Sequence, residues 1–160
     1  MDNDQRSIDE VTERILGAPA LGPGHARIRI VSSYYDIDAA NARLAELRPL
    51  LAALRDARDE VAAGQRRLAD LAATEDADPT AIAREQEGMT ITVKRMEQAV
   101  RQIDARGVTL RDIGTGLVDF PALVNGRPIW LCWKLGEDDI ANWHEIDAGI
   151  AGRKPLIELE

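Results

Sequence analysis

Apolar residues recur at every third or fourth position along two long stretches of the chain, and this spacing predicts two amphipathic helices. Each stretch carries two heptad rows that a neighbouring helix would cover. The rows in the first stretch are Leu47, Leu54, Val61 and Leu68 beside Leu44, Leu51, Arg58 and Gln65, and those in the second are Ile82, Met89, Met96 and Ile103 beside Gln86, Val93 and Val100. The matching rows predict that the two helices pack against each other.

The first helix is expected to run from Ile37 to about Ala73. Asp36 precedes it and is a suitable N-cap, because its carboxylate can accept hydrogen bonds from the free amides of the first turn. Pro49 lies inside this stretch and cannot donate a hydrogen bond to the carbonyl of Ala45. We therefore expect a kink or a break at Pro49.

The second helix is bounded by clear signals at both ends. Asp78 is its expected N-cap, and Pro79 occupies the first helical position, where a missing amide hydrogen costs nothing. Gly107 is expected to end the helix after Arg106. The loop from Thr74 to Thr80 is short, so the two helices must be antiparallel neighbours.

A turn centred on Ala77 determines which residues face each other across this hairpin. The expected pairs are Leu54 with Val100, Val61 with Val93, and Leu51 with Ile103, and Gly64 comes out nearly level with Gly88. Each glycine costs about 1 kcal/mol relative to Ala in a helix. Either the backbones approach each other closely at these glycines, or both are tolerated on the surface.

After Gly107 the apolar period changes from that of a helix to alternation, which predicts strands. We expect three: Val108–Arg111, Gly116–Phe120 and Ile129–Lys134. Asn125-Gly126 lies between the last two and strongly indicates a hairpin turn. The predicted fold class is α+β, with a long antiparallel helical hairpin packed with a small antiparallel β-sheet.

The predicted organisation is an N-terminal extension and linker (1–24) followed by a single α+β domain (25–160). The extension holds one short amphipathic helix, residues 8–16, and then a Gly- and Pro-rich linker. The domain begins with a weakly alternating strand, residues 25–33. Its helical hairpin spans residues 36–106, and its β-rich C-terminal part spans residues 107–160.

The net charge and the single cysteine indicate which partners and which cellular compartment to expect. A formal net charge of -8 disfavours non-specific binding to nucleic acid, which needs cations for the phosphates. One cysteine cannot form an intramolecular disulfide, and neither a membrane span nor a secretory signal is evident. We therefore expect a cytoplasmic protein, and the Ala- and Arg-rich composition suggests a bacterial source.

The order of several motifs resembles a bacterial family known as domain of unknown function 2203. The motifs are Tyr35-Asp-Ile-Asp-Ala-Ala-Asn41, Leu47-Arg-Pro-Leu-Leu51, Gly116-Leu-Val-Asp-Phe-Pro121, Leu131-Cys-Trp133, and Trp143-His-Glu-Ile-Asp-Ala-Gly149 with Gly152-Arg153. The resemblance covers roughly residues 30 to 156, and the motifs of the second half are its specific part. It implies the fold and no established activity.

The densest set of potential metal ligands or acid–base groups is His144, Glu145 and Asp147. An imidazole and two carboxylates within four residues could bind a divalent metal, with Asp119 as a further ligand from a strand. The spacing matches no recognised zinc pattern. The alternative is structural: a histidine that hydrogen-bonds within the fold and carboxylates that cap turns.

Other residues of this region are candidates for a ligand pocket. Trp133 and Trp143, together with Trp130, could line a pocket for a planar ligand, or they could be the bulky core of a small sheet. Arg153 follows Gly152 in a loop that could bind an anion, although a solvated loop is the simpler interpretation. Cys132 lies among apolar neighbours, which is typical of an inert core cysteine.

These features favour a non-catalytic binding or interaction module, since no recognised catalytic motif is present. A hairpin buries only part of its apolar surface, so we expect a second copy of the chain to cover the rest in a homodimer. The alternative is a protein that binds a divalent metal or a small polar ligand, or a hydrolase-like enzyme, with its site around His144, Glu145 and Asp147. Binding to a different protein is a further alternative.

Overall fold

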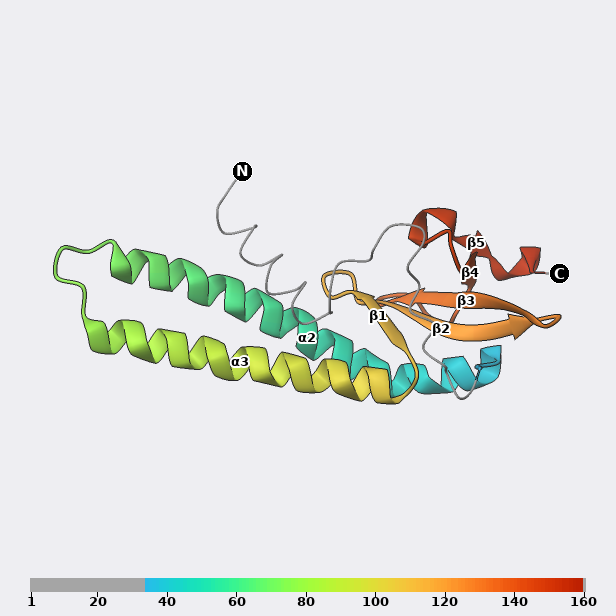
Figure 1. Cartoon of the computed structure of the whole chain (residues 1–160), viewed down its shortest axis with the longest axis horizontal. Coiled ribbons are helices and arrows are strands. Elements are labelled where there is room, and N and C mark those ends of the chain that lie inside the picture. Colours follow the sequence, from blue (N-terminus) through green and yellow to red (C-terminus); the bar gives the residue numbers. More distant parts are fainter. Residues whose placement is uncertain (1–33, 160) are drawn as a thin grey trace.

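The computed structural model describes residues 34–159 and shows two long helices beside an antiparallel sheet (Figure 1). The elements are α2 (Ile37–Ala72), α3 (Pro79–Ala105), β1 (Thr109–Asp112), β2 (Leu117–Val124), β3 (Arg127–Lys134), β4 (Asn142–Glu145) and β5 (Lys154–Pro155), with the 3-10 helices η1 (Ile150–Gly152) and η2 (Leu156–Glu158). This arrangement confirms the predicted α+β class. The predicted extension (1–24), its helix (8–16) and the strand at 25–33 lie outside the described residues.

Both helices begin at the predicted caps. The Asp36 carboxylate accepts a hydrogen bond from the amide of Ala39 at 2.7 Å, and the Asp78 carboxylate accepts one from the amide of Thr80 at 2.9 Å. The helix is not broken at Pro49, because α2 continues through it to Ala72. Burial of apolar residues on both sides of the proline offsets its lost hydrogen bond.

Ion pairs across the hairpin agree with the predicted register. Arg67 pairs with Glu85, Glu60 with Arg95, and Glu46 with Arg106. In each pair, the two residues are within one helical turn of facing each other in the predicted register.

The two glycines of the hairpin differ from each other. A Cβ at Gly64 would meet the side chain of Met89, whereas one at Gly88 would meet nothing within 4 Å. Close approach is therefore found at Gly64 alone, and it involves a side chain.

The five strands form an antiparallel sheet in the order β1-β2-β3-β4-β5. The predicted turn between β2 and β3 is present, and Asn125 (φ 51°) and Gly126 (φ 76°) both adopt the left-handed conformation that such a tight turn requires. The short strands β4 and β5 were not predicted. One face of the sheet packs on the inner part of the hairpin, and the shared core includes Leu44 and Leu47 from α2 and Trp133 from β3.

Tyr35 ties the start of α2 to both other parts of the fold. Its amide donates to the carbonyl of Pro121 in β2 at 2.7 Å, and its hydroxyl donates to the carbonyl of Arg106 at the end of α3. Its ring meets Phe120 edge-on, with ring centroids 5.2 Å apart. One side chain therefore helps to set how the hairpin sits on the sheet.

The far end of the hairpin extends beyond the sheet, and no strand of the described chain lies over it (Figure 1). We call this part the outer arm and define it as residues 60–72 of α2 and 79–97 of α3. Its buried residues are few: Val61 and Gly64 on α2, and Thr92 and Met96 on α3. In the part of the chain that the structure describes, the outer arm therefore lacks the second layer that covers the inner part.

Candidate functional site

Three chemically capable side chains meet on the face of the sheet that points away from the helical hairpin. Asp119 in β2 pairs directly with Cys132 in β3, and His144 in β4 lies diagonally to Cys132, opposite Trp130. Successive residues of a strand point to opposite faces. The neighbours Phe120, Trp133 and Trp143 belong to the core with the helices, which places this sheet cluster (Asp119, Cys132 and His144) on the other face.

The sheet cluster is tight and buried. The relative exposure of Asp119 is 1%, that of Cys132 is 0% and that of His144 is 2%. Nε2 of His144 lies 3.0 Å from Oδ2 of Asp119. One carboxylate oxygen, the Cys132 sulfur and one imidazole nitrogen all lie within 4.8 Å of one another.

Two arginines border the sheet cluster. Nε of Arg111 donates to Oδ2 of Asp119 at 2.8 Å, while the guanidinium lies 5.0 Å from the centre of the Trp130 ring. Arg153 donates to the carbonyl of Cys132 at 3.4 Å and pairs with Glu137 at 2.6 Å. The charge of Arg153 is thus matched by Glu137, whereas Arg111 and His144 share the single carboxylate of Asp119.

The partners of His144 indicate that its imidazole is positively charged. Nδ1 lies 2.8 Å from the carbonyl oxygen of Glu145, which can only accept, and Nε2 faces the carboxylate of Asp119. With Asp119 ionised, both ring nitrogens therefore donate, as only the imidazolium can. Burial alone would lower the pKa of His144, but the hydrogen bond and charge of Asp119, with the Glu145 carbonyl, raise it above the usual value.

Cys132 is a neutral thiol in this environment. Burial raises the pKa of Cys132 to about 12, and the nearby charge of Asp119 adds to this effect, against an opposing contribution from Arg153. A thiolate is the reactive form of cysteine. The buried Cys132 is therefore unsuited to nucleophilic attack on a substrate.

Asp119 has one oxygen that the fold leaves without a partner. Oδ2 accepts from both Arg111 and His144, but Oδ1 is buried and has no hydrogen-bond partner among the residues that the structure describes. Leaving a buried carboxylate oxygen unsatisfied is costly. One oxygen of this carboxylate lies close to the sulfur and the imidazole of the sheet cluster, so Asp119 is the residue at which a further group would be held.

The structure brings together some of the predicted site residues and separates others. Asp119 and His144 meet, and Arg153 lies at the edge of the same cluster. Glu145 points to the other face of β4, where its carboxylate pairs with Arg127 at 2.6 Å. Asp147 is exposed in the turn after β4 and is not part of the sheet cluster.

Two of the three tryptophans predicted to line a pocket lie on the opposite face of the sheet from Asp119. Trp133 and Trp143 are buried in the core shared with the helices. Arg48 of α2 lies over the Trp133 ring at 5.5 Å, and Arg127 lies over the Trp143 ring at 5.7 Å. Trp130 is the tryptophan on the face of the sheet cluster.

Cys132 is buried, as predicted for an inert core cysteine, but its position beside Asp119 was not predicted, and Arg111 was missed. A signal for Cys132 was present, because a two-residue turn at Asn125-Gly126 pairs Asp119 with Cys132 by counting outward along both strands. No comparable signal places His144, since the segment between β3 and β4 is irregular. Arg111 could not be found either, because β1 changes register between Leu110 and Asp112.

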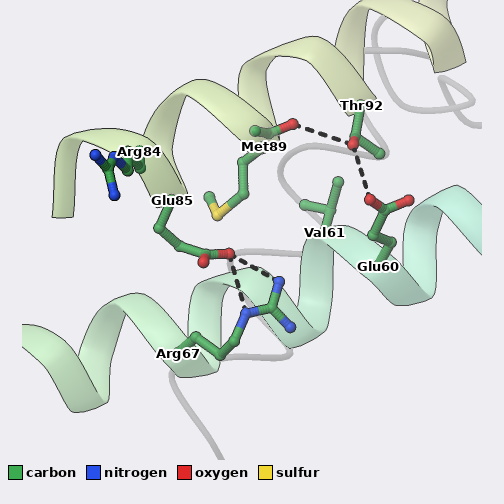
Figure 2. A pocket seen from close by; sticks show the side chains of 8 residues that line it. Glu60, Val61, Arg67, Arg84, Glu85, Met89 and Thr92 are labelled. Atoms are coloured by element: carbon green, nitrogen blue, oxygen red, sulfur yellow. Dashed lines mark hydrogen bonds and ion pairs between the residues drawn. The ribbon is translucent and has the colours of Figure 1, made fainter. Parts of the chain in front are cut away.

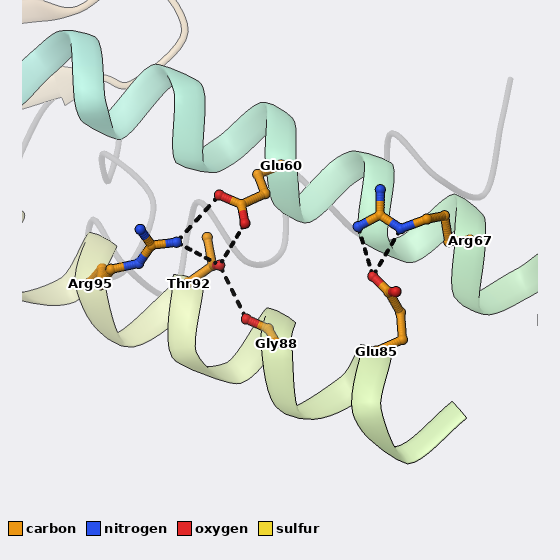
Figure 3. A network of polar contacts seen from close by, with 6 residues as sticks. All are labelled: Glu60, Arg67, Glu85, Gly88, Thr92 and Arg95. Carbon is orange, nitrogen blue, oxygen red and sulfur yellow. Dashed lines mark hydrogen bonds and ion pairs between the residues drawn. The ribbon is translucent and has the colours of Figure 1, made fainter. Parts of the chain in front are cut away.

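The outer arm offers a second candidate surface, and one of its faces is polar. This face has a small hollow of about 210 Å³, and beside it Arg67 of α2 pairs with Glu85 of α3 at 2.8 Å. Figure 2 shows how these two side chains point toward each other across the helices. Figure 3 shows the adjoining network, in which Glu60 accepts from both Thr92 and Arg95. The charged groups of this polar face therefore largely satisfy one another across the two helices.

A larger groove also lies on the outer arm and includes apolar side chains. It has a volume of about 460 Å³, and we call it the arm groove. Its lining residues are Val61, Gln65, Leu68, Gln86, Met89, Thr90, Val93, Lys94 and Glu97. Lys94 and Glu97 on its rim make no ion pair with any residue that the structure describes. Within residues 34–159, this surface therefore has unmatched charges and incompletely covered apolar groups.

The sequence was also compared with known proteins. A family described as "Uncharacterized conserved protein (DUF2203)" matches residues 33–156. The chain belongs to this family. No curated protein and no solved structure matches the chain.

Several residues of the motifs that resemble DUF2203 hold the fold together. The amide oxygen of Asn41 accepts from the backbone of Ile140 at 2.8 Å, and Arg48 donates to the carbonyl of Asp138. With Tyr35, these contacts fasten the first part of α2 to β2 and to the segment between β3 and β4. In the described part of this DUF2203 member, no helix is long and apolar enough to cross a membrane.

Proposed function

We propose that this DUF2203 member is a non-catalytic interaction module that forms a homodimer through the arm groove. The observation that carries the proposal is the difference between the two surfaces of the outer arm. The polar face is bridged by its own ion pairs, whereas the arm groove has half-buried apolar residues and charges that no described residue pairs.

The arm groove has the composition of a helix-binding surface. Leu68, Met89 and Val93 are only partly covered within the hairpin. A helix placed against these side chains would remove further apolar surface from water, at about 25 cal/mol for each Å². Two hairpins joined in this way would make a four-helix arrangement, the usual way for a two-helix layer to complete its core.

A second copy of the same chain fits the charge pattern of the groove. The rim carries one cation, Lys94, and one nearby anion, Glu97, on the same helix. A two-fold axis places the same patch of each copy against the other, so residues of opposite charge on one patch can pair between copies. A rim that carries both signs is therefore suited to self-association.

The chemistry of the sheet cluster supports the non-catalytic part of the proposal. Cys132 is a neutral thiol, and both ring nitrogens of His144 are already bonded to other groups. A general base or nucleophile must reach a substrate atom within hydrogen-bonding distance. These side chains are almost completely buried, which is unfavourable for such an approach.

Sedimentation velocity on the full chain over a range of concentrations tests this proposal. The wild-type chain should be dimeric at micromolar concentration. Thr90→Glu should shift the equilibrium towards monomer, because it adds an exposed charge at the groove. Ile91→Glu is the matched control: Ile91 is 53% exposed and does not line the groove, so the same new charge should leave the dimer intact.

Circular dichroism of both variants should show unchanged helix content, since both positions are exposed. A wild-type chain that stays monomeric at micromolar concentration contradicts the homodimer. A dimer that Ile91→Glu dissociates and Thr90→Glu does not would place the interface on another surface and contradict the arm groove.

A further inference from the structure

We propose that Asp119, Cys132 and His144 form a binding site for a borderline-soft divalent cation of the Zn²⁺ type. The inference is independent of dimer formation, because the sheet cluster and the arm groove lie on different elements. The residues also differ from the set suggested by spacing along the chain, since Glu145 and Asp147 take no part.

The donor set is the first argument. A thiolate, an imidazole and a carboxylate are the three ligand types that proteins offer to Zn²⁺, at distances of about 2.0 to 2.3 Å. Here they come from three adjacent strands, one residue from each. Ligands built on strands are held more precisely than ligands on loops.

The distances between the three ligand atoms are close to those found in a zinc site. The three ligand atoms lie within 4.8 Å of one another. Two ligands in a tetrahedral zinc site are roughly 3.3–3.8 Å apart, as follows from the bond lengths. Nε2 of His144 and Oδ2 of Asp119 are 3.0 Å apart, and no pair of ligand atoms exceeds 4.8 Å, so metal binding needs adjustments of about 1 Å.

The orientation of His144 is the second argument. Its Nδ1 donates to the carbonyl of Glu145 at 2.8 Å, which leaves Nε2 as the nitrogen directed at the sheet cluster. Metal-binding histidines usually donate their other ring N–H to a carbonyl or carboxylate, which fixes the ring. His144 already has this arrangement.

The unpartnered oxygen of Asp119 is the third and independent observation. Oδ1 is buried and lacks a hydrogen-bond partner in the described structure, although Oδ2 has two. A cation would satisfy this lone oxygen. Arg111 can keep its bond to Oδ2 while Oδ1 binds the cation, so the arginine need not leave.

The charges of the cation and of its ligands also balance. Metal binding requires the thiolate and the neutral imidazole, so the protons on the Cys132 sulfur and on Nε2 of His144 go to solvent. The thiolate and the Asp119 carboxylate then match the two charges of the cation. Arg153 remains paired with Glu137, and Arg111 is partly exposed, with a side-chain exposure of 38%.

Titration of the untagged, metal-stripped full chain with Zn²⁺ in competition with a chromophoric chelator tests the site. We expect one Zn²⁺ per chain with a micromolar or tighter Kd. Cys132→Ser and His144→Gln should each weaken binding at least about tenfold, since even losing a supporting partner of a ligand has effects of that size. Asp147→Asn and Glu145→Gln are matched carboxylate controls that should keep wild-type affinity.

Co²⁺ provides a second readout that does not depend on stability. A thiolate-to-cobalt charge-transfer band should appear with the wild-type chain and be absent with Cys132→Ser. Circular dichroism of the metal-free variants checks that each is folded. If His144→Gln does not fold, Cys132→Ser, which is the mildest change, still tests the site. The proposal is overturned if the folded wild-type chain binds no Zn²⁺ at micromolar concentration. It is also overturned if Cys132→Ser keeps full affinity or Asp147→Asn abolishes binding.

Discussion

Replacing Gly88 by Ala should stabilise the hairpin by about 1 kcal/mol. Glycine costs roughly this much relative to Ala in a helix interior. A Cβ added at Gly88 would meet no heavy atom within 4 Å, so nothing opposes the gain. For a chain of this size the change corresponds to an increase in melting temperature of about 2–4 °C.

The same substitution at Gly64 should behave differently. Its Cβ would lie 2.8 Å from Cγ and 2.9 Å from Sδ of Met89. Non-bonded carbon atoms are most stable about 3.5–4.0 Å apart, so Met89 must move by about 1 Å. Overpacking typically costs about 1–3 kcal/mol, which cancels or exceeds the gain in helix propensity. We expect Gly64→Ala to lower the free energy of unfolding by about 0–2 kcal/mol.

Urea unfolding followed by circular dichroism measures both effects, and Met89→Ala supplies the control. In the Met89→Ala background the two closest atoms are gone and only Oε1 of Glu85, at 3.1 Å, remains near the new Cβ, so Gly64→Ala should stabilise by up to about 1 kcal/mol. The double-mutant cycle should therefore give a coupling energy of about 1–3 kcal/mol between the two positions. Equal stabilisation by Gly64→Ala and Gly88→Ala, without coupling to Met89, would refute this packing of the hairpin.

Three further predictions concern the core and the sheet cluster. Leu54→Ala should lower the free energy of unfolding by about 2–5 kcal/mol, because Leu54 is almost fully buried; an unchanged urea midpoint would show that it is exposed. Asp119→Ala should cost about 3–5 kcal/mol in the metal-free protein, because it leaves the buried imidazolium of His144 without its carboxylate; chemical denaturation near pH 6 measures this loss. The raised pKa of His144 means that the folded chain holds this proton more tightly than the unfolded chain, so its contribution is complete below about pH 6.5 and declines as the pH rises through the folded value. His144→Gln should therefore reduce the loss of stability of the metal-free chain as the pH rises above about 6.5, and an unchanged slope in urea unfolding would contradict the assignment.

Signals within a few residues were sufficient to predict the helices and one turn. The capping carboxylates of Asp36 and Asp78 act on amides two or three residues away, so they can be recognised without knowing the rest of the fold. The same is true of Asn125-Gly126, whose conformation and two-residue length also fix the pairing of β2 with β3. The sequence alone is therefore enough to place Asp119 opposite Cys132.

The approach of His144 to that pair was decided only by the tertiary structure. His144 and Glu145 are adjacent along the chain, but a strand turns them to opposite faces, and which face is buried against α2 depends on packing. The continuation of α2 through Pro49 has a similar origin, because buried neighbours outweigh a local preference for a break. Motifs along the chain grouped His144 with Glu145 and Asp147 and offered Asp119 as a further ligand, whereas contacts between strands keep Asp119, add Cys132 and exclude the other two carboxylates.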